Sequence, residues 1–192
     1  MCEGSWVIEQ VGHGTVTIGS IETYITETAF LNGWVKPPKP RVNLDQSVGL
    51  IGAGPAGMAA SDELRRRGYQ VEVYDRYDRV GGLLMYGIPD FKLEKTVVQR
   101  RVQLLSEGGV QFHLGFDVGR DNTLEQLRER HDAILICTGV YKPRIIKAPG
   151  AALRGIQQAL DYLTASNRKG LGDKVPAFES GELNAAEKNV VV

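Results

Sequence analysis

One stretch of the sequence decides the fold: Val48-Gly49-Leu50-Ile51-Gly52-Ala53-Gly54-Pro55-Ala56-Gly57. It begins as a short apolar strand, turns through glycines with the spacing G-x-G-x-x-G, and continues as the start of a helix. In such a turn Gly52 permits the sharp bend, Gly54 lets the backbone approach a pyrophosphate, and Gly57 lets the helix pack on the strand. The helix amino end offers free N–H groups and a partial positive charge to phosphates. The stretch therefore predicts a dinucleotide-binding turn; the alternative is an ordinary glycine turn in a nucleotide-free α/β protein.

An acidic residue stands where such a turn requires one. Asp75 ends the next predicted strand, about 20 residues beyond the glycine turn, at the distance of the acid that binds an adenosine ribose. Its negative charge disfavours a 2′-phosphate and hence NADP at this site, whereas Arg76 and Arg79 nearby would favour one. Strand, turn, helix and acid together favour a nucleotide site.

Strand and helix patterns alternate over residues 46–146. Predicted strands span 48–51, 70–74, 110–114 and 133–137, and predicted helices span 55–67, 93–107 and 124–130. We expect the last strand, A-I-L-I-C, to be buried on both sides because it is apolar throughout. Arg65-Arg66-Arg67 suits a solvated helix end rather than a nucleic-acid patch. The alternation predicts an α/β fold with a Rossmann-like, FAD/NAD(P)-binding parallel sheet.

A second glycine cluster follows the acid: Arg79-Val80-Gly81-Gly82-Leu83-Leu84-Met85-Tyr86-Gly87-Ile88-Pro89. A simple NAD fold needs no such cluster. A larger cofactor does, because the chain must pass close to its pyrophosphate and ribitol, where glycine has no Cβ to clash. Four apolar residues of the cluster would suit the wall of a flavin pocket: Leu83, Leu84, Met85 and Ile88. The cluster therefore favours FAD over NAD, with a surface loop as the alternative.

The predicted strand 133–137 delivers Thr138 and Gly139 at its carboxyl end. Ligands of open parallel sheets lie at that end, so both residues should face the cofactor. Cys137 is interpreted as a small buried hydrophobic residue. The three histidines, His13, His113 and His131, are scattered without the spacing of a metal site, and no Ser, His and Asp arrangement suggests a nucleophile.

The two flanking zones differ from the alternating region. Residues 1–40 contain one helix candidate with Ser20 as its cap and Asn32-Gly33 as its stop, followed by a proline-rich connector. Residues 147–192 are expected to be less ordered, with one helix containing Ile156, Ala159, Leu160 and Leu163. The sequence ends in three valines, and because a core strand seldom ends a protein, we expect it to be truncated.

Composition limits the class of protein. Lys and Arg total 23 and Asp and Glu total 23, and this formal neutrality disfavours binding to nucleic acid. Two cysteines are too few for a disulfide framework and favour a reducing, cytoplasmic compartment. No apolar run approaches the ~20 residues of a membrane helix, and the amino end shows no signal peptide. We therefore expect no membrane partner.

Three stretches resemble the small (β) subunit of bacterial NADPH-dependent glutamate synthase: G-A-G-P-A-G, D-R-Y-D-R-V-G-G-L-L-M-Y-G-I-P-D-F-K-L-E-K and C-T-G-V-Y-K-P-R. The resemblance continues in K-A-P-G, A-L-D-Y-L-T-A-S-N and C-E-G-S-W-V-I-E-Q, so it covers essentially the whole chain. It implies a flavoprotein oxidoreductase in which NADPH reduces FAD. Electrons then pass through iron–sulfur clusters to the large (α) subunit, where 2-oxoglutarate and glutamine yield glutamate.

The resemblance also assigns FAD contacts residue by residue. Those at the pyrophosphate and ribose would be Gly52, Ala53, Gly54, Pro55, Ala56, Gly57 and Asp75. Those further along the cofactor and toward the flavin would be Arg76, Gly81, Gly82, Leu83, Ile88, Pro89 and Lys92. The backbone near Val118, with Thr138 and Gly139, would complete the site. No residue is assigned a catalytic role, because the flavin carries the chemistry.

The resemblance also implies which domain of the family each part of the chain corresponds to. Residues 1–40 would be a short helical remnant of an iron–sulfur domain with a proline linker. Residues 41–146 would be the FAD-binding domain, and residues 147–192 a connecting helix and loop leading into a truncated NADPH-binding domain. Cys2 matches one cluster-ligating cysteine, but the family's next cysteine falls at Trp6. An indole cannot ligate iron, so this chain should not hold a 4Fe–4S cluster by itself.

Two other interpretations remain. The chain could be a non-catalytic fragment that binds FAD or docks a partner without accepting electrons. It could also be the flavin segment of a paralogous enzyme resembling dihydropyrimidine dehydrogenase or sulfide dehydrogenase.

Overall fold

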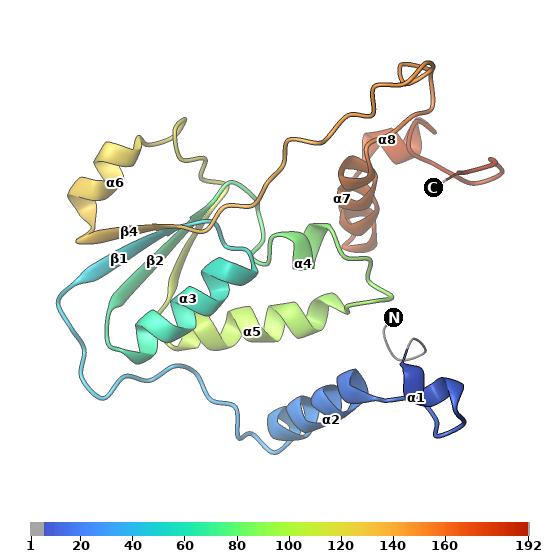
Figure 1. The fold of residues 1–192 in the computed structure, drawn as a ribbon. Helices are drawn as coiled ribbons and strands as arrows, with labels where there is room; N and C mark the ends of the chain where they lie inside the picture. The colour runs from blue at the N-terminus through green and yellow to red at the C-terminus, as the bar shows by residue number, and fades with distance from the viewer. Residues whose placement is uncertain (1–5, 192) are drawn as a thin grey trace. The chain divides into compact units, whose positions relative to one another are not determined.

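The computed structural model describes residues 6–191, which are drawn as a ribbon in Figure 1. They divide into two compact units between Lys36 and Pro37, inside the proline-rich connector. The second unit contains the sheet together with residues 147–191. Each unit is described separately below.

The first unit contains α1 (Val7–Gln10) and α2 (Ile18–Leu31). The predicted cap at Ser20 is wrong, because α2 begins earlier and has Thr17 at its N-cap position. The predicted stop is confirmed: Asn32 is the C-cap, and Gly33 follows with φ 63°. Across residues 6–191, no helix combines the length and the apolar character needed to cross a membrane.

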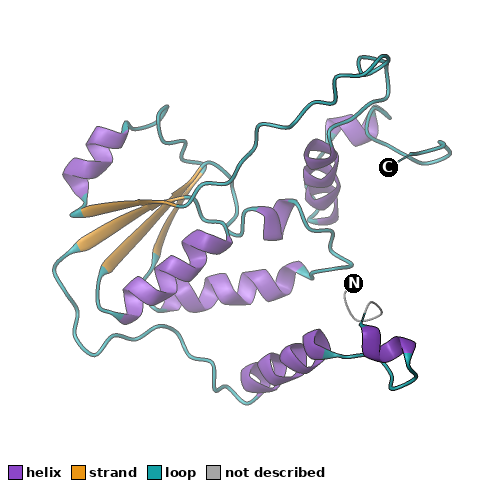
Figure 2. Cartoon of the chain, viewed as in Figure 1, coloured by secondary structure: helices purple, strands orange, loops and turns teal. Residues whose placement is uncertain are grey.

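A parallel sheet forms the centre of the second unit (orange in Figure 2). Its strands are β1 (Ser47–Ile51), β2 (Gln70–Asp75), β3 (Gln111–Leu114) and β4 (Ala133–Ile136), in the order β3-β2-β1-β4. In the register of the sheet, Leu50 pairs with Val73 on one side and with Leu135 on the other. The predicted Rossmann-like parallel sheet is therefore confirmed.

Two helices, α3 (Pro55–Arg66) and α5 (Lys95–Glu107), lie side by side over one face of the sheet (Figure 1). Alternation along β1 explains the packing: Val48 and Leu50 join the core, whereas a Cβ on Gly49 would meet His131 and Ile134. Burial of each such aliphatic side chain contributes about 1.5–3 kcal/mol. A further helix, α6 (Leu124–Arg130), lies beside β4.

The last strand is less buried than its composition predicts. Within the described chain β4 pairs only with β1, and Leu135 is 41% and Ile136 61% exposed. The expectation of a strand buried on both sides is therefore wrong. A continuous apolar run indicates that a strand favours burial under other parts of a protein. It does not tell whether the strand lies at the centre or at the edge of the sheet.

The arginine run at the end of α3 also differs from expectation. Arg65 is part-buried, and its guanidinium donates to the carbonyl of Gly108 (2.7 Å) and to Asn43 Oδ1 (2.8 Å). Arg66 and Arg67 instead form exposed ion pairs within the helix. Two members of the run are solvated, and the third joins α3 to remote backbone.

The carboxyl-terminal zone contains more helix than the sequence predicts. The expected helix is α7 (Ala159–Gly170), and Ile156 lies outside it, 55% exposed. The short helix α8 (Pro176–Glu179) was not predicted, and neither was α4 (Leu83–Tyr86), which lies earlier in the chain, in the second glycine cluster. A second apolar cluster of Met85, Tyr86 and Val98, with Leu171 packed against it, joins α4, α5 and the end of α7. Val190 and Val191 are exposed and form no strand, and Val192 lies outside the described residues.

Candidate nucleotide-binding site

The turn between β1 and α3 requires glycine at both of its ends. Gly52 has φ 110°, and a Cβ there would lie 2.7 Å from the carbonyl oxygen of Cys137. A Cβ on Gly57 would overlap the carbonyl oxygen of Gly52. The predicted roles of these two glycines, sharp turn and close helix packing, are therefore confirmed.

The second glycine cluster contacts this turn directly. The N–H of Gly81 donates to the carbonyl of Ala53 (2.9 Å), and Gly82 adopts φ 52°. A Cβ on Gly82 would lie 2.9 Å from the Cα of Gly54. Two glycine-rich segments that are separate in the sequence thus meet backbone to backbone.

Gly54 differs from the other glycines of the site. A Cβ added to it would have one neighbour at the limit of contact, the Cα of Gly82 at 4.0 Å. Its φ of −74° is accessible to any residue. Packing within the protein therefore does not demand glycine here, whereas the approach of a phosphate to the amino end of α3 would.

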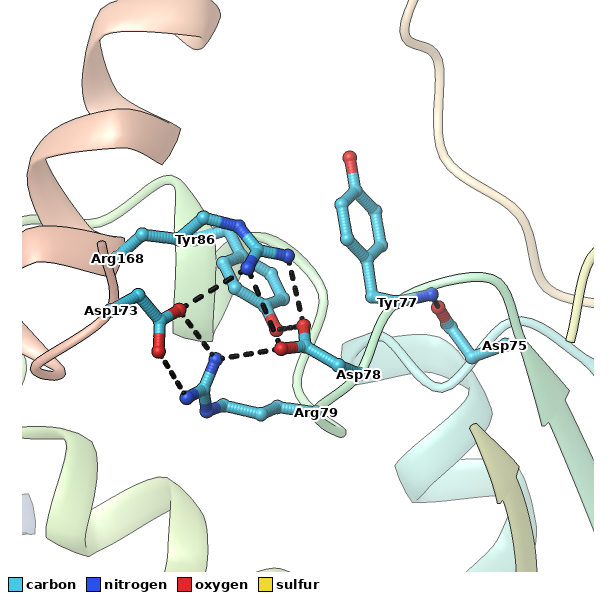
Figure 3. A network of polar contacts seen from close by, with 7 residues as sticks. All are labelled: Asp75, Tyr77, Asp78, Arg79, Tyr86, Arg168 and Asp173. Atoms are coloured by element: carbon cyan, nitrogen blue, oxygen red, sulfur yellow. Dashed lines mark hydrogen bonds and ion pairs between the residues drawn. The ribbon is translucent and has the colours of Figure 1, made fainter. Parts of the chain in front are cut away.

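Asp75 is braced at the carboxyl end of β2. Its Oδ2 accepts the N–H of Ala53 (2.6 Å) and its Oδ1 accepts the N–H of Tyr77 (2.8 Å); Figure 3 shows the Tyr77 contact. Each carboxylate oxygen retains a second lone pair. The carboxylate is therefore fixed in orientation and can still accept hydrogen bonds from ribose hydroxyls.

A cavity of about 480 Å³ opens where β1, β2 and β4 end, a volume within the usual range of small-molecule sites. The predicted residues that line it are Gly52, Gly54, Pro55, Ala56, Asp75, Arg76, Gly82, Leu83, Val118, Thr138 and Gly139. The lining residues that sequence reasoning did not assign to the cofactor are Ile51, Tyr74, Tyr77, Phe116, Asp117, Cys137 and Tyr141.

Two aromatic residues of this lining contact Arg76. Its guanidinium lies 4.2 Å from the ring centroid of Tyr141 and 5.2 Å from that of Tyr77, distances of cation–π contacts. Burial raises the pKa of Tyr141 and of the Cys137 thiol, so both stay protonated at neutral pH. The site thus offers one cation, Arg76, two carboxylates, Asp75 and Asp117, and aromatic surface.

Two of the scattered histidines meet around Tyr74. The ring of His113 stacks on Tyr74 at 4.7 Å between centroids, and Nε2 of His131 lies 2.9 Å from the Tyr74 hydroxyl. Burial, followed by the hydrogen bond to Glu72, raises the pKa of Tyr74 to about 12. Over residues 6–191, no cluster of His, Cys, Asp and Glu has the makings of a metal site.

Comparison with known proteins identifies the relationship. Residues 50–111 match a family described as a NAD(P)-binding Rossmann-like domain. Over all 192 residues the chain is 63% identical to "Glutamate synthase [NADPH] small chain" of Azospirillum brasilense, covering 40% of that protein. It is 60% identical over the same length to a putative small chain of Cereibacter sphaeroides, covering 46% of it. The chain is a homologue of glutamate synthase small chains. The resemblance found in the motifs is thus confirmed, and the chain spans less than half the length of these two relatives.

A solved structure supports the fold alone. FprA of Mycobacterium tuberculosis, in complex with NADPH, superimposes with a TM-score of 0.54 at 23% identity, covering 67% of this chain and 29% of FprA. At that identity the likeness extends to the arrangement of strands and helices and no further.

Some residues assigned from the glutamate synthase small-chain motifs lie away from the cavity. Those that do not line it are Ala53, Gly57, Gly81, Ile88, Pro89 and Lys92. Gly57 and Gly81 lie behind the surface, against Gly52 and Val98. Of the apolar residues expected to wall a flavin pocket, Leu83 lines the cavity, whereas Met85 is 2% exposed in the second apolar cluster.

Proposed function

We propose that this chain is part of the FAD-binding region of a glutamate synthase small-chain oxidoreductase, which passes electrons from NADPH through FAD. One observation carries the proposal: the cavity lies where both glycine turns meet, beside Asp75, and Gly54 has no packing reason to be glycine. Space held open by a missing Cβ, next to a helix amino end, fits a pyrophosphate.

The residues of the cavity divide the binding work. The N–H groups at the start of α3 would hold the pyrophosphate, and Asp75 would accept hydrogen bonds from the ribose of the adenosine half. Thr138 and Gly139, which line the cavity beyond β4, would contact the cofactor further along. When bound, FAD would supply the chemistry of electron transfer, and the protein would supply position and electrostatics. Ile88, Pro89 and Lys92 remain proposed contacts toward the flavin.

The remaining assignments concern the longer protein. We infer a large-subunit partner from the words "small chain" in the names of the relatives. We propose 2-oxoglutarate and glutamine as substrates of the longer protein on the family resemblance of the motifs. Residues 1–40 are proposed to be the tail of a helical iron–sulfur domain with a proline linker. Residues 41–146 are proposed to bind FAD, and residues 147–192 to be a connecting helix and loop leading into an NADPH-binding domain. Cys2, the expected relic of a cluster ligand, lies outside the described residues, and Trp6 is 44% exposed.

The decisive experiment is a titration of the purified chain with FAD, in which binding is measured by the quenching of flavin fluorescence. We expect Gly54→Val to lower FAD affinity at least about a hundredfold, because a branched side chain would occupy the place of the pyrophosphate. Gly19→Val, which adds the same side chain to α2 where nothing lies within 4 Å, is the matched control and should bind FAD normally. Unchanged affinity of the Gly54 variant, or no binding by the unmodified chain, would refute the proposal.

A second measurement distinguishes the non-catalytic interpretation from an oxidoreductase. A fragment that binds FAD without accepting electrons would show flavin binding but no NADPH-driven reduction of a dye. Turnover of the dye by the purified chain would exclude it. The name "oxidoreductase" would then apply to these residues themselves.

A further inference from the structure

A polar network joins the second glycine cluster to α7 (Figure 3). Arg79 and Asp173 form a two-point pair, with N–O distances of 2.7 and 2.9 Å, across 94 positions of sequence. Arg168, in the last turn of α7, donates to Asp78 (2.9 Å) and to Asp173 (3.2 Å). Tyr86 of α4 donates its hydroxyl to Asp78. Two carboxylates, two guanidinium groups and one phenol are thus connected in one hydrogen-bonded network.

The same helix end also holds α4 by contacts other than ion pairs. The side-chain amide of Asn167, 6% exposed, donates to the backbone carbonyl of Tyr86 (3.0 Å). The guanidinium of Arg168 lies 5.0 Å from the ring centroid of Tyr86. Leu171 packs against the apolar cluster that contains this ring. The end of α7 therefore contacts α4 through polar, aromatic and apolar groups.

The segment held in this way is the one that contacts the nucleotide turn. Asp78 and Arg79 precede the glycine pair and Tyr86 follows it, so both flanks of Gly81 and Gly82 are tied to α7. The pair itself has φ values of 127° and 52°, in the region where glycine is favoured. Glycine loses more conformational freedom on ordering than other residues do. This segment therefore needs contacts from outside to stay in place.

We propose that Arg168 and Asp173 are positioning residues of the cofactor site: they hold the Gly81-Gly82 segment against Gly54 and thereby set the affinity for a dinucleotide cofactor. This inference rests on the proposed function. Neither residue lines the cavity, so each acts through Arg79, Asp78 and the glycine pair. Gly82 and Leu83 form part of the cavity wall. Loss of the contacts made by Arg168 and Asp173 would let this segment move out of the wall.

Asp173→Asn is the informative variant, because it keeps the shape of the side chain and removes its charge. We expect it to raise the Kd for FAD about tenfold, since charge-assisted bidentate bonds are the strong ones. Arg79→Met should have a similar effect. The double variant should then lose little more affinity than either single variant, because the two residues act as one unit. Arg168→Gln, which leaves the Arg79–Asp173 pair intact, should have a smaller effect and serves if Asp173→Asn fails to fold.

A second readout separates positioning from general stability. In the ligand-free chain, Asp173→Asn should speed amide hydrogen exchange at Gly81, whose N–H donates to Ala53, and at Leu84, whose N–H donates to Gly81. Exchange in β1 and β2 should stay unchanged. Lys169→Ala is the control from the same helix turn, because Lys169 lies over the ring of Phe178 instead of joining the network.

The outcomes of the two readouts are distinct. Unchanged Kd for Asp173→Asn, additive effects in the double variant, or an equal loss in Lys169→Ala would overturn the inference. If the unmodified chain binds no FAD, the proposed function fails. Amide hydrogen exchange in Asp173→Asn then still tests whether Asp173 holds the Gly81-Gly82 segment. Unaltered exchange at Gly81 would overturn this positioning role as well.

Discussion

The two glycine turns of the site are stabilised by different kinds of contact. The turn between β1 and α3 combines a local contact, in which Gly57 packs on Gly52 only a few positions earlier, with backbone contacts of Gly52 to Tyr74 of β2 and to Cys137 after β4. The Gly81-Gly82 segment is fixed by groups from elsewhere. Besides the network to α7, Nζ of Lys95 donates to the carbonyls of Leu84 (3.1 Å) and Ile88. The first turn is thus held in part by contacts within its own strand and helix, whereas the flanks of the second are held by α5 and by the end of α7.

The largest effect is expected from breaking the first turn. In Gly57→Ala the new Cβ would overlap the carbonyl oxygen of Gly52, and Gly52 is itself fixed by its N–H bond to the Tyr74 carbonyl (2.8 Å). Both groups are backbone, so neither can move aside cheaply. We expect the free energy of unfolding to fall by more than about 3 kcal/mol, measured by urea denaturation.

Gly19→Ala in α2 is the matched control for this substitution. No atom lies within 4 Å of its added Cβ, so the change should be neutral or stabilise the helix by about 0.5–1 kcal/mol. A loss below about 1 kcal/mol for Gly57→Ala would show that the turn tolerates movement of its backbone, and the contrast between the two turns would weaken.

The same contrast explains what the sequence allowed us to predict. The bounds of β1 and α3 were predicted to within a residue, because strand, turn and helix signals lie next to one another. Asp75 followed from its distance to the turn. Tyr141 and Phe116 were missed because they come from irregular segments, where no periodicity tells which way a side chain points.

Remote pairings were invisible for a related reason. The contact between Arg79 and Asp173 spans 94 positions, and nothing in the pattern of either segment encodes the other. The position of β4 at the edge of the described sheet was missed likewise, since Leu135 and Ile136 have the composition of a covered strand. Local signals therefore predicted the elements and one turn, and tertiary contacts determined the remainder of the site.

An intermediate effect is expected from acid, which should act on the second turn. The hydrogen bond from Arg79 holds the pKa of Asp173 below its ordinary value. Burial alone would raise the pKa of Asp78, but the bond from Tyr86 and the charges of Arg168 and Arg79 keep it lowered. Because both values are depressed, the stabilisation is fully present above the unfolded-state pKa of about 3.9 and is lost as the pH falls through the lower folded-state values.

FAD affinity should accordingly stay level from neutral pH to about 4.5 and decline below about pH 4, as measured by fluorescence titration. Amide protection at Gly81 should decline in the same range. In Asp173→Asn one of the two carboxylates is gone, so the decline should be shallower. A decline centred near pH 6 would instead indicate a histidine and would contradict the assignment to the network.

The smallest effect is expected where a charge pair is local and exposed. Arg66 pairs with Asp62 one turn earlier in α3 at 3.1 Å, with side chains 46% and 29% exposed. Water screens such a pair, and the two side chains lose freedom in forming it, so Arg66→Ala should change the free energy of unfolding by less than about 0.5 kcal/mol. It should leave FAD affinity unchanged, since no segment of the site is tied to α3 through this residue. A tenfold loss of affinity in this variant would show that any surface arginine near the sheet affects the site, and the distinction between local and remote contacts would fail.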